Sequence, residues 1–336
     1  MLNLHKNHKN LVLVAGLVFI ALSIAISVIP AYQMQEVEPI PNQKPLTANE
    51  ERGLRLYVAE NCAACHTQQV RNIEMDAMWG DRPSIPSDYV YSKKRLDIWR
   101  QSPSILGSER TGPDLTNIGK RQPSEDWHLL HLYNPRAVVP ESVMPSYPWL
   151  FREKDSTLLT SDDKVVAVSE EFFNKPGKKI VATPEALYLV EYLQSLKQTE
   201  MPGGDVSEFI PALRKEREAA AAAGTGGGLD GAALYKQTCA ACHQDNGKGV
   251  TGAFPPLAGS ALVTADDPEM LIRVIIQGYN SRPDYAVMPP FGDMLTDAEI
   301  AAIATHERTS WGNSASEITE DDVKKIREYV ENELNP

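Results

Sequence analysis

The sequence predicts a mainly α-helical chain in which one N-terminal membrane-spanning helix precedes two helical domains of the same kind. Three observations support this fold class. An uncharged stretch of 19 residues, 11–29, begins close to the N-terminus. The five residues CAACH occur at 62–66 and again at 239–243, in each case shortly after a Gly-x-x-Leu-Tyr motif. Capping motifs that start helices lie on both sides of these repeats.

The apolar stretch 11–29 is nearly long enough to cross a bilayer of about 30 Å at 1.5 Å per residue. Two lysines precede it and the next charged residue is Glu36, so the positive-inside rule places residues 1–10 in the cytoplasm. A cleavable signal peptide is the alternative, but its apolar region is only about 7–15 residues long and 28–32 is a poor cleavage site. We expect a retained single-pass anchor, 11–30, in the inner (cytoplasmic) membrane, with the periplasmic domains following it.

Two C-x-x-C-H boxes use all four cysteines of the chain: Cys62, Cys65 and His66, then Cys239, Cys242 and His243. This spacing is typical of covalent c-type haem attachment, with the histidine as an axial ligand of the iron. Structural zinc sites space their ligands differently, and a thioredoxin-like pair would need one C-x-x-C in a βαβ pattern. The boxes therefore predict two covalently bound haem c groups.

Acidic residues are concentrated in the second half of the chain. The net charge of −12 argues against nucleic acid as a partner. Residues 229–336 contain 17 acidic and 8 basic residues, a net charge of −9, which leaves −3 for all the others. This acidic surface either keeps the domain soluble or forms a docking face for a basic partner.

Helix signals set the domain limits. A capping box at Thr47 starts the helix before the first CAACH, and Thr183 followed by proline starts an amphipathic helix, which together define a first domain at 46–200. A linker, 201–228, contains the glycine-rich run 224–228 and is expected to be flexible.

The second domain is expected at 229–336. A capping box at Thr296 starts one helix, and a last helix has Val323, Ile326, Val330 and Leu334 along one stripe.

The first haem has six candidates for its sixth ligand, namely Met75, Met78, Met144, Met201, His128 and His131. Met144 lies in a proline-rich loop, whose stiff backbone suits a ligand, whereas His128 or His131 would give a bis-histidine iron. Met75 and Met78 follow the first box too closely to reach the far face of the haem. We predict Met144.

The second haem is expected to be ligated by Met288, which immediately precedes two prolines. Met294 is the fallback, and Met270 also competes. A methionine sulfur would close the iron to external ligands and raise its reduction potential.

The two domains resemble class I cytochromes c in the Gly-x-x-Leu-Tyr motif before each box. The resemblance implies that the glycine and the aromatic residue of the first helix in each domain pack against a terminal helix, as they do in that family. It also implies that Pro113 and Pro255 supply the carbonyl that accepts a hydrogen bond from each proximal histidine, which the alternative of two ordinary turns would not.

Residues 1–197 more closely resemble the membrane-anchored mono-haem subunit II of cbb3-type cytochrome c oxidases. The resemblance rests on residues 65–71, 110–115, 126–128, 132–136 and 139–150. The second domain resembles small cytochromes c associated with respiratory oxidases, including the tail 310–313. There are two departures. The family's subunit II ends after one haem, and His306-Glu307 stands where a tyrosine and an apolar residue are expected, which we expect to affect local packing only.

The resemblance implies a non-catalytic, dihaem electron-transfer subunit of a cbb3-type haem–copper oxidase. Electrons would pass from a donor, such as a basic cytochrome c, through the second and first haems to the catalytic subunit in the membrane. Arg71 and Arg136 are candidates for contacts with haem propionates or another subunit, or are ordinary solvated arginines. The alternatives are a subunit of a nitric oxide reductase or dehydrogenase, and a dihaem peroxidase, which would need an open iron with an acid–base group beside it.

Overall fold

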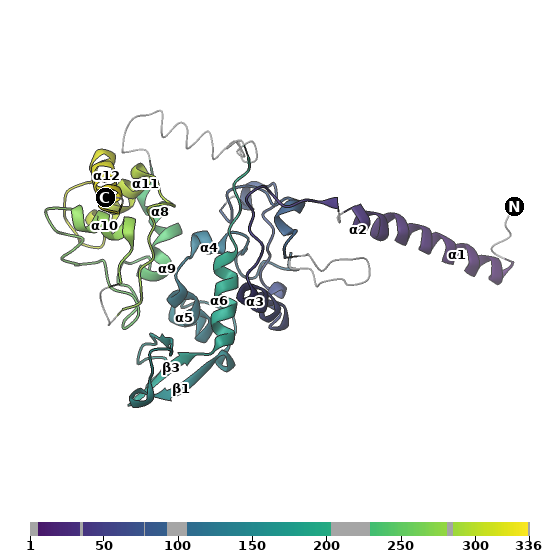
Figure 1. The fold of residues 1–336 in the computed structure, drawn as a ribbon, viewed down its shortest axis with the longest axis horizontal. Coiled ribbons are helices and arrows are strands. Elements are labelled where there is room, and N and C mark those ends of the chain that lie inside the picture. The colour runs from purple at the N-terminus through teal and green to yellow at the C-terminus, as the bar shows by residue number, and fades with distance from the viewer. Residues whose placement is uncertain are drawn as a thin grey trace.

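The computed structural model describes residues 6–33, 36–76, 78–92, 106–202, 229–280 and 285–334. The fold is mainly helical, with an N-terminal helix that stands apart from two domains (Figure 1). From residue 203 onward, the predicted linker, including the glycine-rich run 224–228, lies outside the described residues.

The N-terminal helix consists of α1 (His8–Ser23), a π-helical turn (Ile24–Val28) and α2 (Ile29–Gln33). It begins three residues before the predicted anchor and ends three residues after it. It is long and apolar enough to cross a membrane. The π turn lies just before Pro30, whose ring lacks an N–H and would crowd the preceding turn of a regular α-helix. The wider turn accommodates this proline without ending the helix.

The segment between this helix and the first domain packs onto that domain. Ile40 is buried, and the Gln43 side-chain amide donates a hydrogen bond to the carbonyl oxygen of Asp88 at 2.9 Å. The first domain therefore holds this proline-rich segment against its own surface.

The first domain is built on the crossing of α3 (Ala48–Ala59) and α6 (Pro184–Ser195) (Figure 1). A Cβ added at Gly53 would lie only 2.0 Å from the carbonyl oxygen of Tyr188, so only glycine permits this approach. Beside it, the rings of Tyr57 and Tyr192 pack with their centroids 5.6 Å apart. The predicted capping box, helix start and glycine crossing are confirmed.

In the part of this domain that the structure describes, the other α-helices are α4 (Ile118–Arg121) and α5 (Glu125–Tyr133). A small antiparallel sheet, which the sequence did not predict, precedes α6. Its strands are β1 (Phe151–Asp155), β2 (Val165–Val166) and β3 (Lys178–Ala182), in the order β1-β3-β2. These strands are short, and the charged residues in β1 obscure the alternation by which a strand is recognised.

The second domain contains α8 (Gly231–Thr238), α9 (Ala240–His243), α10 (Glu269–Gln277), α11 (Asp297–Thr309) and α12 (Glu320–Leu334). Helices α8 and α11 cross as α3 and α6 do, because a Cβ at Gly231 would lie 2.2 Å from the Ala302 carbonyl oxygen. The predicted capping box at Thr296 is present. The Tyr235 ring packs against His306 and Trp311, with centroids 5.3 and 4.9 Å away.

The two domains touch along the face where α9 lies beside α4 and α5 (Figure 1). Ala253 and Phe254 of the second domain are buried in the same apolar cluster as the first-domain core. The second haem box is therefore close to the first domain.

Candidate haem sites

The first box follows α3 directly. Its residues Cys62–Ala64 form a single 3₁₀ turn, entered through Asn61 in the left-handed conformation (φ 57°), which asparagine tolerates better than most residues. The His66 Nδ1 lies 2.8 Å from the carbonyl oxygen of Pro113, so this nitrogen is the donor and Nε2 remains free. Burial lowers the pKa of His66, which favours the neutral ring that binds a metal.

The second box repeats this arrangement at the junction of α8 and α9. The His243 Nδ1 lies 2.9 Å from the Pro255 carbonyl oxygen, and burial lowers the pKa of this histidine as well. The two histidine–carbonyl hydrogen bonds implied by the resemblance are thus both present. Their role in holding a proximal haem ligand remains a prediction.

All four thiols of the boxes are free, and burial affects the pKa of three of them. Burial raises the pKa of Cys62 and of Cys242 to about 12, and raises that of Cys239 well above its ordinary value. Zinc ligands and reactive redox cysteines are thiolates, which lowered pKa values favour. Thiols that stay neutral do not suit a reactive redox pair, and the C-x-x-C-H spacing favours covalent haem attachment.

The loop that carries Met144 is held by Arg136. The guanidinium donates hydrogen bonds to the carbonyl oxygens of Ser142 and Met144, both at 3.1 Å, and to the hydroxyl of Ser146 at 3.0 Å. Met144 is half-buried and packs against the same core as Cys62. In this structure Arg136 therefore positions the predicted ligand loop, a role that its place eight residues before Met144 did not reveal.

The other candidate ligands of the first haem differ in their surroundings. Met75 and Met78 are exposed. His128 is buried, and its Nε2 lies 2.8 Å from the carbonyl oxygen of Gln122. The His131 ring stacks on Trp127, with centroids 4.6 Å apart, and its buried Nδ1 has no hydrogen-bond partner among the described residues. The assignment of Met144 remains a prediction.

The second site surrounds a cavity of about 660 Å³. Its walls are largely apolar and include the predicted attachment and ligand residues Cys239, Cys242, His243, Pro255 and Met288. Met288 is fixed by a two-way backbone pairing with Tyr279, at 2.9 Å in each direction. Met294 packs into the core instead of lining the cavity, and Met270 lies on the rim with its side chain exposed.

Glu307 also lines this cavity. It is 4% exposed, and burial raises its pKa to about 8. The expectation that His306-Glu307 affects local packing only is therefore too narrow. His306 does pack against Tyr235, but Glu307 places a titratable carboxyl in the wall of the second site.

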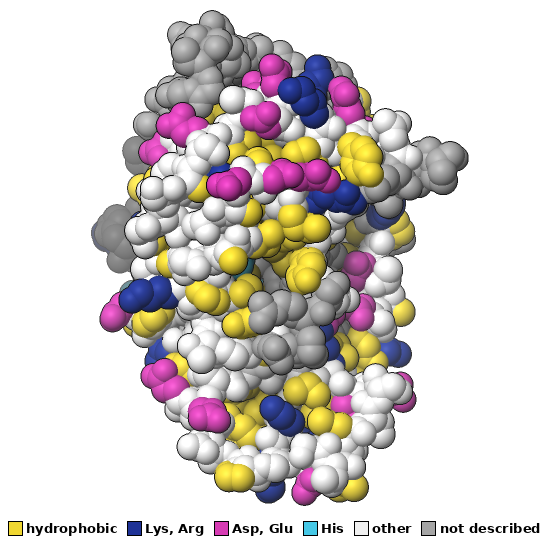
Figure 2. Space-filling model, turned by 90° about the vertical axis from the view of Figure 1, so that its left-hand side faces the viewer, with side chains coloured by type: hydrophobic (Ala, Val, Ile, Leu, Met, Phe, Trp, Pro, Cys, Tyr) yellow, Lys and Arg dark blue, Asp and Glu magenta, His cyan; other side chains and the backbone are white. Residues whose placement is uncertain are grey.

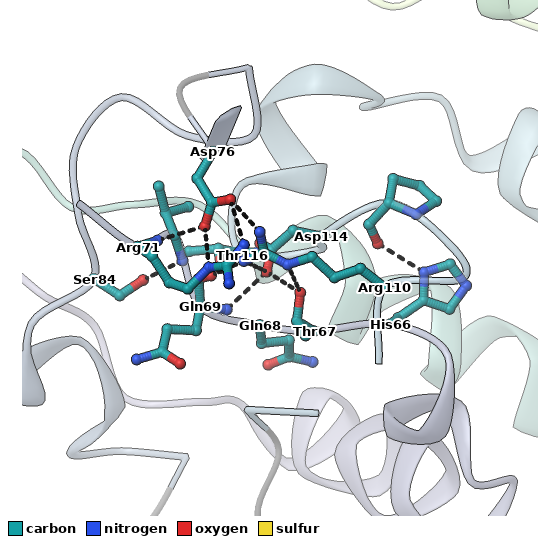
Figure 3. Close-up of polar contacts among 12 residues, drawn as sticks. His66, Thr67, Gln68, Gln69, Arg71, Asp76, Ser84, Arg110, Asp114 and Thr116 are labelled. Atoms are coloured by element: carbon teal, nitrogen blue, oxygen red, sulfur yellow. Dashed lines mark hydrogen bonds and ion pairs between the residues drawn. The ribbon is translucent and has the colours of Figure 1, made fainter. Parts of the chain in front are cut away.

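An ionic network around the buried carboxylate of Asp76 supports the segment after the first box (Figure 3). Arg71 binds Asp76 through two nitrogens at 3.0 Å, and Arg110 pairs with the same carboxylate. Burial alone would raise the pKa of Asp76, but these hydrogen bonds hold it well below its usual range. Arg110 also donates to the Thr67 hydroxyl at 2.8 Å. The guanidinium of Arg71 is thus engaged in stabilising the domain.

A further arginine fits a bound haem. Burial lowers the pKa of Arg121 to about 10, and its charge acts on His66. The buried Nε of Arg121 has no hydrogen-bond partner among the described residues. A haem carries two carboxylates, so a buried cation with a spare donor beside the first box suits this cofactor. The apolar cavity at the second box falls in the size range of cofactor pockets.

The rim of the second cavity is apolar and exposed. Leu262, Met270, Tyr279 and Val287 line the cavity and have large exposed fractions. On the face of the molecule shown in Figure 2, hydrophobic side chains gather across the middle, with both acidic and basic side chains around them. An apolar centre with a charged surround is a common form of protein-docking surface.

Two family models match the chain. The family described as "Cytochrome C oxidase, mono-heme subunit/FixO" matches residues 3–199. The family described as "Cytochrome C oxidase, cbb3-type, subunit III" matches residues 228–306. The sequence thus resembles two different oxidase subunits in succession.

Similar proteins include both dehydrogenase subunits and a single-domain cytochrome. The cytochrome c subunit of the quinone alcohol dehydrogenase of Gluconacetobacter polyoxogenes is 27% identical over 305 residues, covering 88% of this chain and 55% of the relative. This chain therefore spans about half the length of that protein. Cytochrome c-552 of Thermus thermophilus is 40% identical over 111 residues, covering 29% of this chain and 84% of the relative. The fructose dehydrogenase cytochrome subunit of Gluconobacter japonicus is 34% identical over 154 residues, covering 41% of this chain and 32% of the relative.

Proposed function

This chain belongs to the family of mono-haem cytochrome c oxidase subunits (FixO), and we propose that it is the dihaem electron-transfer subunit of a cbb3-type haem–copper oxidase. It is a cytochrome c subunit of a membrane oxidoreductase, which implies a catalytic partner subunit. In our proposal the N-terminal helix is a single-pass anchor in the inner membrane, with its N-terminus in the cytoplasm and both haem domains in the periplasm.

The observation that carries this proposal is the presence of two matched sites on one chain. In each site a C-x-x-C-H box presents a neutral histidine whose Nδ1 is fixed by a proline carbonyl. A haem c held there supplies one-electron exchange at its iron. We assign His66 and Met144 as the axial ligands of the first site, and His243 and Met288 as those of the second.

Electrons would enter at the second site and leave from the first. The apolar rim of the second cavity and the acidic charge of residues 229–336 suit a basic donor such as a small cytochrome c. The first domain follows the membrane helix directly, so it lies nearer to a membrane-embedded acceptor. The subunit III match of residues 228–306 supports the further proposal that the second domain replaces part or all of that separate subunit.

A second candidate function is electron transfer for a quinone-linked membrane dehydrogenase. The 27% identity to an alcohol dehydrogenase cytochrome subunit over 88% of this chain favours it. In that case the chain would receive electrons from a dehydrogenase and pass them toward quinone.

Affinity purification of the tagged full-length chain from detergent-solubilised membranes distinguishes the two. The oxidase proposal expects a haem–copper subunit to copurify and the complex to consume oxygen when a reduced donor is supplied. Copurification with a dehydrogenase, and oxygen consumption in a separate fraction, would reject it. Carbon monoxide binding to the reduced isolated chain tests the ligands, because irons closed by both histidine and methionine should not bind it.

A further inference from the structure

Helix α5 of the first domain contacts the second haem site at two places. The indole Nε1 of Trp127 donates a hydrogen bond to the carbonyl oxygen of Ala241, at 2.8 Å, and Ala241 lies between the two cysteines of the second box. One residue earlier, the Asp126 carboxylate accepts a hydrogen bond from the backbone N–H of Val287 at 3.0 Å. Val287 immediately precedes Met288. Two consecutive residues thus bind both the box and the predicted ligand segment.

An apolar centre and additional polar contacts support these bonds. Phe254 is buried within the first-domain core cluster, and Cys242 packs against it. The side chain of Gln244 donates to the Val138 carbonyl oxygen at 3.3 Å. Lys164 pairs with Asp126 at 2.7 Å and so orients its carboxylate. Domains of one chain move relative to each other unless their interface is well buried, and these contacts favour a fixed arrangement.

Trp127 also reaches toward the first site. Its ring stacks face to face on His131, with centroids 4.6 Å apart and planes inclined by 11°. Trp127 also packs against the same apolar cluster as Cys62 and Met144 of the first site. An aromatic pair therefore extends from the second box into the core on which the first site is built.

We infer that Trp127 and His131 form the path by which an electron crosses from the second haem site to the first, and that the Trp127–Ala241 hydrogen bond holds the two sites at a fixed separation. This inference rests on the proposed function, because it needs a haem at each box. One electron leaves the second site for each electron that the first site gains, and no bond is made or broken. Both side chains are positioning residues and are not themselves oxidised.

The test compares substitutions of two tryptophans in the isolated full-length holoprotein. Trp127→Leu removes both the ring and the donor, whereas Trp127→Phe keeps a ring and removes only the N–H. Trp149→Leu is the matched control, because Trp149 is an exposed tryptophan of the first domain whose indole bonds only to Glu60 in the described structure. Two quantities are measured. Hydrogen exchange of the peptide containing Val287 reports docking, and haem-methyl NMR signals of half-reduced protein report the rate of electron exchange between the sites.

We expect Trp127→Leu to accelerate exchange at Val287 and to slow electron exchange, each by roughly tenfold, the factor that corresponds to loss of one hydrogen bond and its packing. Trp127→Phe should accelerate hydrogen exchange with a smaller loss of electron-exchange rate, and Trp149→Leu should change neither. Unchanged electron exchange in Trp127→Leu would overturn the path. Unchanged hydrogen exchange in Trp127→Phe would overturn the holding role.

The conservative Trp127→Phe variant decides the question if Trp127→Leu does not fold. An effect of Trp149→Leu equal to that of Trp127→Leu would also overturn the inference, because it would show a general response of the domain. No partner complex is present in this experiment. A negative result therefore leaves the proposed oxidase function intact, and a failed copurification leaves this result interpretable.

Discussion

Replacing the buried carboxyl of Glu307 with an amide should make the second domain more stable, and increasingly so as the pH rises. Burial raises the pKa of Glu307 from its ordinary value of 4.5 to about 8. Between these pH values the folded protein keeps a proton that the unfolded chain has lost. The folded state then binds more protons, so the free energy of unfolding falls with rising pH. Glu307→Gln removes this titration.

Each pH unit between the ordinary and the raised pKa of Glu307 contributes about 1.4 kcal/mol to the effect. The variant should match the wild type near pH 4.5, exceed it by about 3 kcal/mol at pH 7, and exceed it by about 5 kcal/mol above pH 8. Denaturant unfolding of the second domain at a series of pH values measures this difference. Glu328→Gln, a substitution of an exposed glutamate on α12, is the control and should follow the wild type.

The same carboxyl should also influence the reduction potential of the second haem. An ionised Glu307 in the wall of the second cavity favours the oxidised, more positive iron, so the wild-type potential should fall with pH around 8, by at most about 59 mV per pH unit. The variant should lack this slope. Parallel pH profiles of stability and potential in wild type and Glu307→Gln would refute the reasoning, because they would show that Glu307 is not the titrating group.

Three further substitutions test the packing around the sites. Gly53→Ala places a Cβ 2.0 Å from the Tyr188 carbonyl oxygen and should destabilise the first domain by about 3 kcal/mol in thermal unfolding, whereas the exposed Arg55→Ala on the same helix should remain near wild type. Gly112→Ala places a Cβ 2.2 Å from Cε1 of His66, so the spectrum and potential of the first haem should change while those of the second stay constant; an unaltered first haem would contradict the placement of this ring. Arg136→Lys replaces a guanidinium that donates to three acceptors with a single ammonium, which should loosen the Met144 loop. The reduced haem of the first site alone, about half of the total haem, should then bind carbon monoxide. Retained closure in that variant would show that Met144 is held by other contacts.

The features that could be predicted from sequence are the local ones. The capping boxes at Thr47 and Thr296 could be predicted because their hydrogen bonds join residues three apart, and both are confirmed. The helix crossings at Gly53 and Gly231 could be predicted because the same motif precedes both boxes, and both crossings are confirmed. Each histidine–proline hydrogen bond followed from a family resemblance and is present in the structure.

The features that escaped prediction depend on residues distant in sequence. Trp127 and Ala241 are 114 residues apart, and no local pattern indicates that an indole will meet the second box. Glu307 was expected to affect only local packing, because its place in the cavity wall appears only once α11 is positioned. Arg136 was expected to contact a haem propionate or another subunit, or to be solvated, because the Met144 loop that it holds folds back on it only in three dimensions. The strands β1–β3 are too short and too charged to show a periodicity.

The packing of Ile40 onto the first domain sets how far this domain can stand above the bilayer. Only six residues lie between Gln33, the last residue of the helix, and Ile40, so the gap between them is at most about 25 Å even for a fully extended chain. With α1 and α2 in the membrane, as proposed, this short tether keeps the first domain near the bilayer. That position suits the membrane-embedded acceptor proposed above.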